Sequence, residues 1–267
     1  AQELRKRLGK TLPKTLDYIT VSGSGEPTLY PFLRELALAI KSVMPRVPLA
    51  ILTNSSLLQR SDVRDALRSF DLVVAKLDAP KQELFELINQ PFSDLKLDRV
   101  VEGLKELRKL IGRKLAIQVM LLKSSRDQRL NNAEIPIIKE LSEVLSEVSP
   151  SVVYLNTPTR PPREPYIEPL KPSELIAAKE VLRNSLPEEV AIETYSPQTP
   201  AVAPHLKKPS EEEVLNLLRR RPCRLVDIAL ALQASIDEVN KVIDELLKKE
   251  LVEATRHAGE VYFKAKP

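Results

Sequence analysis

Short apolar segments alternate with longer amphipathic segments along most of the chain, and this alternation constrains the fold more than any other feature. The apolar runs predict buried strands, and apolar residues at helical spacing between them predict helices. Each helix must carry the chain back to the start of the next strand, so the repeats predict an α/β fold with mostly parallel strands. Five or six such repeats suit either an incomplete (β/α) barrel or an open sheet. The predicted strands cover residues 17–21, 49–53, 72–77, 115–122, 151–156 and 190–194, and the predicted helices cover residues 30–43, 61–68, 97–110, 133–148 and 173–185.

The pattern changes after the last predicted strand. Between Ser196 and Pro209 the regular spacing is lost and prolines recur, which indicates a stiff linker. Ser210 and Glu213 then form a capping-box pattern that opens the first of three short helices. The other two helices are predicted at residues 223–233 and 235–249, and a hairpin at residues 251–254 and 261–264. Three helices followed by a hairpin predict a winged helix, so we expect an α/β domain at residues 1–205 and a winged-helix domain at residues 206–267.

Composition excludes several classes of protein. The chain is 43% hydrophobic and 29% charged, which suits a folded domain with a core. No apolar run is long enough to span a membrane and no signal peptide is visible, so we expect a cytoplasmic protein with no membrane partner. Cys223 is the only cysteine, which excludes an intrachain disulfide and any thiolate metal cluster built from this chain alone.

Charge leaves two interpretations open. The net charge of +4 and the pI near 9.0 permit binding to phosphate-rich partners, whereas abundant Lys and Glu are equally typical of a thermophile protein. The chain begins with Ala1 rather than Met, from which we expect that the natural N-terminus was removed or processed.

The segment from Val21 to Leu29 reads VSGSGEPTL and closes the first predicted strand. Gly23 and Gly25 let the backbone approach a ligand closely, and Glu26 places an anion at the carboxyl edge of the sheet. A carboxylate there disfavours a phosphate cradle, and the sequence has neither a GxGxxG nor a GxxxxGK[ST] motif. A ligand ammonium group fits better. The alternative is a glycine turn in which Glu26 only starts a helix.

Polar residues also end the other predicted strands, and in a parallel sheet these ends share one edge. Asp78 is placed to accept hydrogen bonds from ribose hydroxyls, while Asn54 and Asn156 offer both donors and acceptors. Lys76 and Gln118 lie within or at the end of neighbouring strands. Taken singly, each of these residues is more often a turn or cap residue.

Taken in order, the segments SGSGEPTL, ILTNSSLL, VVAKLDAP, INQP and LNTPTRPP resemble the radical S-adenosylmethionine (SAM) superfamily. They are most similar to its branch of Fe-S oxidoreductases related to wyosine-tRNA synthesis and to glycyl-radical activating enzymes. The resemblance spans residues 17–163 and implies a partial (β/α) barrel with a GGE-type motif after its second strand. It also implies that Ser24, Gly25 and Glu26 bind the methionine amino group and that Lys76 or Asp78 faces the ribose.

The resemblance implies an oxidoreductase that cleaves SAM reductively to a 5′-deoxyadenosyl radical, which abstracts hydrogen from an unknown substrate such as a tRNA or a protein. It further implies a reductant such as ferredoxin or flavodoxin. The chief departure is the CxxxCxxC loop, which this chain lacks. The [4Fe-4S] cluster is therefore expected only in a full-length parent, with no metal ligand on this chain, and the chain itself is expected to be inactive. No catalytic residue of the chain is identified.

The rival interpretation is a non-enzymatic regulatory protein that binds nucleic acid or another protein through the winged helix. Arg219, Arg220, Arg221 and Arg224 form a basic patch that favours nucleic acid. Acidic residues of the predicted helix at 235–249 would oppose phosphates, and from Pro209 onward ten basic residues face eleven acidic ones. That balance favours protein docking over nucleic acid for this domain.

Overall fold

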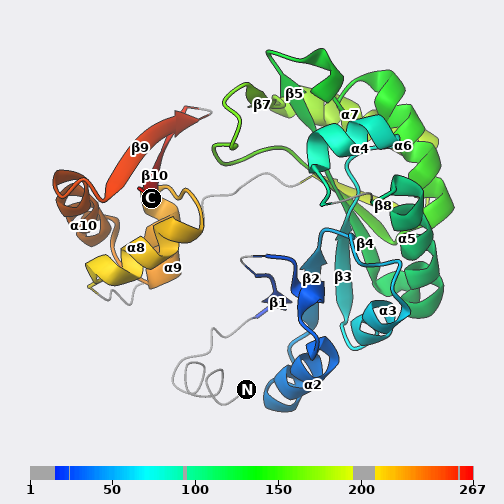
Figure 1. Cartoon of the computed structure of the whole chain (residues 1–267), viewed down its shortest axis with the longest axis horizontal. Helices are drawn as coiled ribbons and strands as arrows, with labels where there is room; N and C mark the ends of the chain where they lie inside the picture. The colour runs from blue at the N-terminus through cyan, green and yellow to red at the C-terminus, as the bar shows by residue number, and fades with distance from the viewer. Residues whose placement is uncertain (1–15, 24, 93–94, 195–207, 258, 267) are drawn as a thin grey trace. The chain divides into compact units, whose positions relative to one another are not determined.

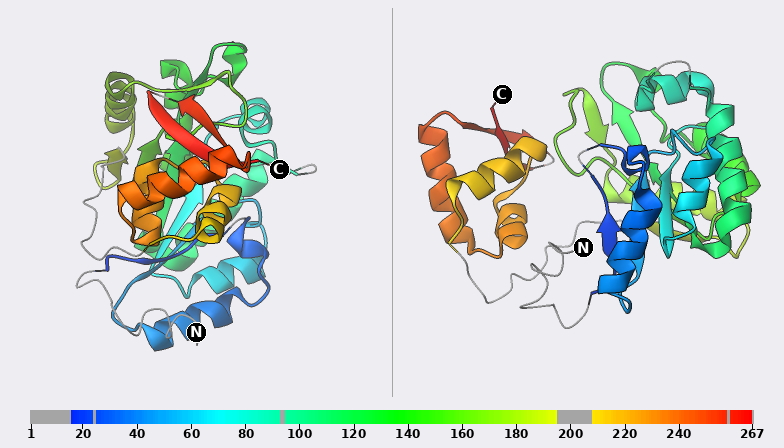
Figure 2. Two further views of the ribbon diagram at one scale, coloured as in Figure 1. Left: turned by 90° about the vertical axis from the view of Figure 1, so that its left-hand side faces the viewer. Right: turned by 60° about the horizontal axis from the view of Figure 1, so that its bottom comes forward.

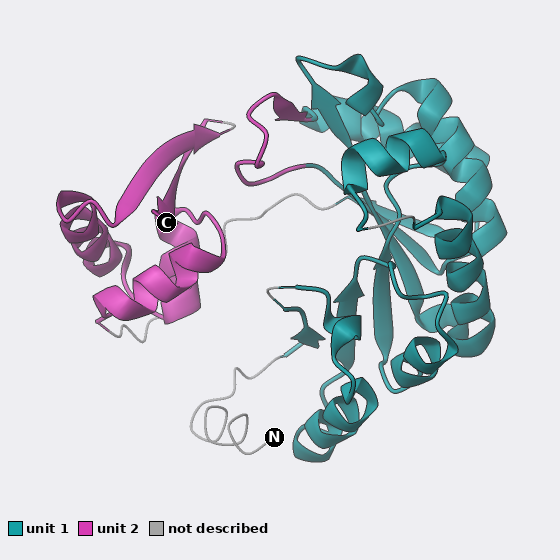
Figure 3. Cartoon of the chain, viewed as in Figure 1, with its two compact units in different colours: residues 1–157, 170–195 teal, residues 158–169, 196–267 magenta. Residues whose placement is uncertain are grey.

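The computed structural model describes residues 16–23, 25–92, 95–194, 208–257 and 259–266 (Figure 1). The chain divides into two compact units, shown in different colours in Figure 3. The first contains residues 1–157 and 170–195, and the second contains residues 158–169 and 196–267. No helix in the described part of the chain has the length and apolar character needed to cross a membrane.

The described residues of the first unit form a six-stranded sheet in which every pair of neighbours is parallel. The strands lie in the order β1-β2-β3-β4-β6-β8, which is also their order along the chain. A doubly wound open sheet would reverse direction at a switch point, whereas this order never reverses. The prediction of a partial (β/α) barrel is therefore confirmed. The strands are β1 (Ile19–Val21), β2 (Leu49–Thr53), β3 (Leu72–Lys76), β4 (Leu115–Met120), β6 (Val152–Asn156) and β8 (Ala191–Thr194).

The connecting helices lie along one face of this curved sheet, as Figure 2 shows from two further directions. They are α2 (Leu33–Val43), α3 (Ser61–Leu67), α5 (Leu97–Ile111), α6 (Ile135–Val148) and α7 (Pro172–Ser185). The core of the unit forms between them and the sheet, with Leu49, Ile51, Leu104, Ile117 and Leu141 among its fully buried side chains. Burial of this apolar surface supplies the main stabilisation of the unit.

Several short elements were not predicted from the sequence. The most important is α4 (Gln82–Asn89), which follows β3. The predicted strand at 115–122 is divided after β4, because the buried side chain of Asn132 accepts a hydrogen bond from Leu122 N at 2.8 Å and donates one to Met120 O at 2.8 Å. The remaining short elements are β5 (Leu122–Ser124), β7 (Ile167–Pro169) and the 3₁₀ turns η1 (Pro27–Leu29), η2 (Gly112–Lys114) and η3 (Gln128–Leu130).

The second unit contains α8 (Glu211–Arg220), α9 (Leu225–Leu232), α10 (Ile236–Lys248) and the antiparallel strands β9 (Val252–His257) and β10 (Glu260–Ala265). Its own core includes Val214, Ile228, Val239 and Ile243. The predicted capping box is confirmed, since the Ser210 hydroxyl accepts from Glu213 N and the Glu213 carboxylate accepts from Ser210 N.

The second unit also holds the segment 158–169, which follows β6 in the chain. The Tyr262 hydroxyl of β10 donates a hydrogen bond to Thr159 O, and His257 Nε2 lies 3.5 Å from Pro158 O. These contacts attach the segment to the β9–β10 hairpin. The residues that flank it belong to the first unit, where Leu170 N donates a hydrogen bond to Thr157 Oγ1 at 2.8 Å.

Gly103 lies in the middle of α5 and packs against the segment that follows β2. A Cβ at this position would lie 2.6 Å from Leu58 C and 2.7 Å from Leu58 O, closer than real Cβ atoms approach backbone. We predict that Gly103→Ala destabilises the protein by about 1–2 kcal/mol, because overpacking outweighs the better helix propensity of alanine. Urea denaturation measures the shift in midpoint.

The exposed neighbour Glu102 provides the control, since Glu102→Ala is expected to change stability by less than about 0.5 kcal/mol. Greater stability of Gly103→Ala than of the wild type would contradict the tight contact between α5 and Leu58.

Candidate functional site

Glu26 joins the loop after β1 to the end of β2. Its Oε1 accepts hydrogen bonds from Thr28 N, Thr28 Oγ1 and Thr53 Oγ1 at 3.1, 2.7 and 2.7 Å. Its Oε2 accepts one, from Asn54 N at 2.7 Å. Glu26 thus caps η1. This agrees with the alternative interpretation of the sequence, in which Glu26 starts a helix after a glycine turn. A carboxylate oxygen offers about two acceptor positions, so Oε2 retains capacity for one further donor.

The glycines of the same loop differ from each other. A Cβ on Gly23 would lie 3.1 Å from Gly25 O, so this position favours glycine for steric reasons. A Cβ on Gly25 would meet nothing within 4 Å, so the chain leaves open space beside that backbone. Open space there is compatible with a ligand that approaches the main chain. Ser24, which the resemblance assigns to the same site, lies outside the described residues.

The ends of β2 and β3 are tied together through Ser55. The buried Ser55 hydroxyl donates to Lys76 O at 2.8 Å, and Ser55 takes a positive φ of 69°. The preceding Asn54 is exposed and its Oδ1 accepts from Ser56 N at 2.9 Å, which forms a local turn. These bonds fix the backbone from which Asn54 and Lys76 extend.

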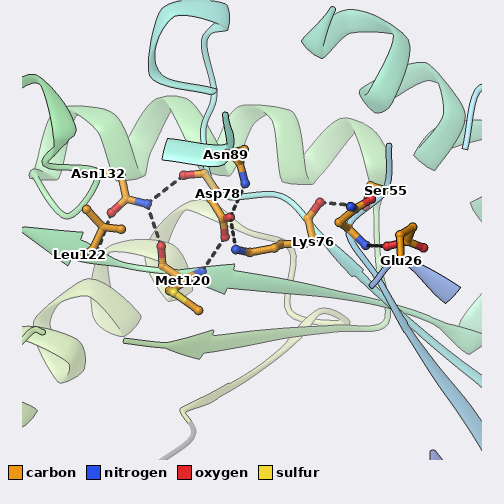
Figure 4. Close-up of polar contacts among 9 residues, drawn as sticks. Glu26, Ser55, Lys76, Asp78, Asn89, Met120, Leu122 and Asn132 are labelled. Carbon is orange, nitrogen blue, oxygen red and sulfur yellow. Dashed lines mark hydrogen bonds and ion pairs between the residues drawn. The ribbon is translucent and has the colours of Figure 1, made fainter. Parts of the chain in front are cut away.

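Asp78 lies at the centre of a buried polar network (Figure 4). Its carboxylate is completely inaccessible to solvent and accepts from Met120 N at 2.8 Å and Asn89 Nδ2 at 2.7 Å. Lys76 Nζ lies 2.9 Å from Asp78 Oδ2, and Asn132 Nδ2 donates to Asp78 O at 2.9 Å. Asp78 therefore orients Lys76 and closes the end of β4. The sequence did not indicate Asn89 or Asn132, because the partners are distant along the chain.

A pocket of about 1020 Å³ opens beside these residues. It contains three of the predicted site residues, Glu26, Asn54 and Lys76, whereas Asp78, Gln118 and Asn156 do not line it. The remaining wall comes from η1, the segment after β2, α4, residues between α4 and α5, and the start of α5. It includes Leu29, Leu57, Phe85, Ile88, Asn89, Phe92, Leu95, Lys96 and Arg99.

Gln118 and Asn156 lie instead on the face of the sheet that the connecting helices do not cover. The parallel register places Lys76, Gln118, Tyr154 and Glu193 side by side on four neighbouring strands. Asn156 is opposite Met120, and its Oδ1 is buried without a hydrogen-bond partner among the described residues. A buried acceptor of this kind is costly unless a donor reaches it.

Tyr154 and Glu193 were not identified from the sequence. Burial, together with the charges of Glu193 and Tyr18, raises the pKa of the Tyr154 phenol, so its hydroxyl stays protonated at neutral pH. The alternation of side chains along a strand could have predicted both positions. It places Tyr154, for example, on the same face as Asn156.

The described residues contain no group of His, Cys, Asp and Glu side chains that could hold a metal ion. Cys223 is buried in the second unit, where burial raises the pKa of its thiol despite the nearby positive charge of Arg221. An iron–sulfur cluster needs several cysteine thiolates and Cys223 is the single cysteine of the sequence, so the donor set of this chain does not fit such a cluster.

The fold of the first unit is similar to that of radical SAM enzymes of known structure. A domain of pyruvate-formate lyase-activating enzyme from Bacteroides vulgatus has a TM-score of 0.50 and 16% identity, and the match covers 68% of this chain and all of that domain. Streptococcus suis SuiB bound to S-adenosylmethionine has a TM-score of 0.50 and 18% identity, and the match covers 67% of this chain and 39% of SuiB. A radical SAM methyltransferase from Sphaerobacter thermophilus has a TM-score of 0.50 and 17% identity, and the match covers 71% of this chain and 53% of that protein.

The chain belongs to the UPF0026 family. It is 30% identical to a UPF0026 protein of Helicobacter pylori strain 26695, over 84% of this chain and 68% of that protein. UPF0026 protein MJ1312 of Methanocaldococcus jannaschii is 39% identical over 64% of this chain and 50% of that protein. A Brachyspira hyodysenteriae protein named GTPase Obg is 33% identical over 93% of this chain but only 34% of its own length.

The chain thus spans about a third of the Brachyspira protein and half of the Methanocaldococcus protein. The name GTPase describes a longer protein, and this sequence has no GxxxxGK[ST] motif. No protein-family model matches the sequence.

We predict that Asp78→Ala destabilises the protein by about 2–4 kcal/mol, since it leaves the Met120 N–H, the Asn89 amide and the Lys76 ammonium without their acceptor. Urea denaturation measures the loss. Asp65→Ala removes an exposed carboxylate 4.0 Å from Arg68 and serves as the control, with an expected change below about 0.5 kcal/mol. Similar losses in both variants would show that the buried network contributes little.

Proposed function

We propose that the first unit is the SAM-binding part of a radical SAM oxidoreductase, in the branch related to wyosine-tRNA synthesis and glycyl-radical activation. The observation that carries the proposal is Glu26, a carboxylate fixed at the pocket with an acceptor position left on Oε2. The open space beside Gly25 supports it, because a ligand there meets backbone rather than a side chain.

In this proposal Glu26 Oε2 accepts a hydrogen bond from the methionine amino group, with Ser24 and Gly25 beside it. Lys76, oriented by Asp78, faces the ribose. Because Asp78 is fully buried, its contribution is to position Lys76 rather than to contact the ribose itself. A charged hydrogen bond between Glu26 and the ammonium group would supply the strongest single contact.

The remaining predicted residues contact the rest of the cofactor. Asn54 lies next to Glu26 at the pocket. Gln118 and Asn156 extend from the uncovered face of the sheet, and the unpaired Asn156 Oδ1 offers an acceptor to a ribose hydroxyl or to the adenine amino group. The cofactor would then lie across the carboxyl edge of the sheet, from β1 to β6.

When bound to a [4Fe-4S] cluster and reduced, SAM supplies the 5′-deoxyadenosyl radical that abstracts hydrogen in this class of enzyme. Cys223 alone cannot supply the thiolates that such a cluster needs, so no step of that chemistry is assigned to the chain. The role proposed for its residues is to bind SAM, to orient its amino acid end and to exclude water.

The proposal extends to the domains. We assign residues 1–205 to the SAM-binding barrel and residues 206–267 to a winged helix, which three helices followed by an antiparallel hairpin support. The segment 158–169 packs with the second unit although it belongs to the barrel in sequence order.

We predict that Glu26→Gln weakens SAM binding at least about tenfold, because the amide cannot offer a charged acceptor to the ammonium group. Isothermal titration calorimetry measures the dissociation constant. The same titration with 5′-methylthioadenosine, which lacks the amino acid end, is expected to be unchanged by this substitution. That ligand separates loss of the ammonium contact from a distorted pocket.

Glu143→Gln makes the same chemical change on the exposed side of α6 and is the matched control. SAM binding of equal strength in Glu26→Gln and Glu143→Gln would contradict the role of Glu26. Failure of the wild-type chain to bind SAM would contradict the proposed function.

A further inference from the structure

The pocket extends well beyond the residues assigned to SAM. Glu26, Asn54 and Lys76 line only one part of it. The other part is formed by the end of α4, the segment that follows it and the first turn of α5. We call this second part the outer lobe and define it by Asn89, Phe92, Leu95, Lys96 and Arg99.

The outer lobe carries two positive charges without partners. Lys96 and Arg99 are exposed, and no carboxylate lies within ion-pair distance of either among the described residues. Further along α5 the basic side chains have acceptors. Lys105 pairs with Glu147 at 3.1 Å, Lys109 with Glu106 at 2.6 Å, and Arg108 donates to Ser149 O. Among the described residues, the unpaired cations of this region are therefore Lys96, which directly precedes α5, and Arg99 in its first turn, and both line the pocket.

The outer lobe also exposes an aromatic ring. Phe92 is 96% accessible to solvent, the highest value among the large apolar side chains described. A single exposed apolar residue needs no explanation on an ordinary surface. Here the ring stands on the wall of a pocket beside two cations, which is the combination that binds a flat ring and an attached anion.

Unsatisfied polar groups complete the lobe. Asn89 donates its amide N–H to Asp78, but its Oδ1 is buried without a partner in the described part of the chain. Gln90 follows it on the same wall of the pocket. Amide side chains offer both donors and acceptors to the edge of a heterocycle.

We infer that the outer lobe binds a nucleotide, with the base on Phe92 and the phosphate between Lys96 and Arg99. A phosphate monoester carries about −1.5 to −2 charges near neutral pH and so matches two cations, whereas a carboxylate supplies only one. The nucleotide is either free or the 5′-phosphorylated end of an RNA strand, because a phosphodiester inside a strand carries only one charge. The inference rests on the proposed function only in placing SAM in the other part of the pocket, next to this ligand.

Isothermal titration calorimetry with 5′-UMP tests the inference, in the presence of saturating SAM. Uridine and ribose 5-phosphate separate the contributions of the base and the phosphate. The variants are Phe92→Ala and the double variant Lys96→Ala/Arg99→Ala. The matched control is Arg46→Ala/Lys139→Ala, which removes the same charge from exposed positions away from the pocket.

We expect 5′-UMP to bind in the presence of SAM and more tightly than uridine or ribose 5-phosphate. Phe92→Ala should weaken 5′-UMP about tenfold and leave ribose 5-phosphate unchanged, because only the stacked base is lost. Lys96→Ala/Arg99→Ala should weaken the binding of 5′-UMP and of ribose 5-phosphate about fivefold or more. Neither the salt dependence of their binding nor the affinity for uridine should increase. The control double variant should match the wild type.

Three results would overturn the inference: no binding of 5′-UMP, equal affinity for uridine and 5′-UMP, or equal losses in the pocket and control double variants. Displacement of 5′-UMP by SAM would also overturn it, since the nucleotide would then occupy the cofactor part. The proposed function fails separately, through SAM titration alone. A tetrauridylate strand with a 5′-phosphate that binds more tightly than 5′-UMP would identify RNA as the source, and one that binds more weakly would identify the free nucleotide.

Discussion

A carboxylate without access to water holds together the sheet edge beside the pocket of the first unit. Asp78 receives hydrogen bonds from the last residue of β4 and from the last residue of α4, and it pairs with Lys76 at the end of β3. An ionised carboxylate in this position is tolerated only while these partners surround it. The same requirement fixes the partners, because any shift of α4 or β4 would leave the charge unsatisfied. The pocket wall is therefore set by an interaction that lies behind it.

Different residues line the pocket and support the sheet edge behind it. At the pocket, the half-buried Glu26 accepts hydrogen bonds from Thr28 N and Asn54 N, and the exposed Asn54 accepts one from Ser56 N. The buried residues, Asp78 and Asn132, contact only protein groups. Side chains available to a ligand thus keep their orientation without using all of their hydrogen-bonding capacity.

Much of the fold could be predicted from the sequence, because strand and helix periods are local properties. The six strands of the sheet and the convergence of Glu26, Asn54 and Lys76 follow from them. The burial of Asp78 could not be predicted. Its partner Asn132 is 54 residues away, and a carboxylate after a strand is usually exposed.

Other differences between the sequence-based predictions and the structure have equally specific causes. Helix α4 has only eight residues, too few for its period to distinguish it from a loop, and it forms much of the pocket wall. Tyr154 and Glu193 were within reach of the sequence, since they alternate along their strands with residues of the opposite face. The winged-helix assignment depends on how three helices pack, which a single sequence does not specify.

The segment 158–169 has a consequence for how the chain is organised. Because this segment packs with the β9–β10 hairpin, the chain passes between the two units three times, after residues 157, 169 and 195. The proline-rich stretch is thus one of several covalent connections rather than the single tether that its composition suggests. A fragment of residues 206–267 would lack Thr159, the acceptor for the Tyr262 hydroxyl, and would expose a phenol that the intact chain keeps bonded. The smaller unit is a discontinuous domain, and its natural boundaries cannot be drawn with one cut.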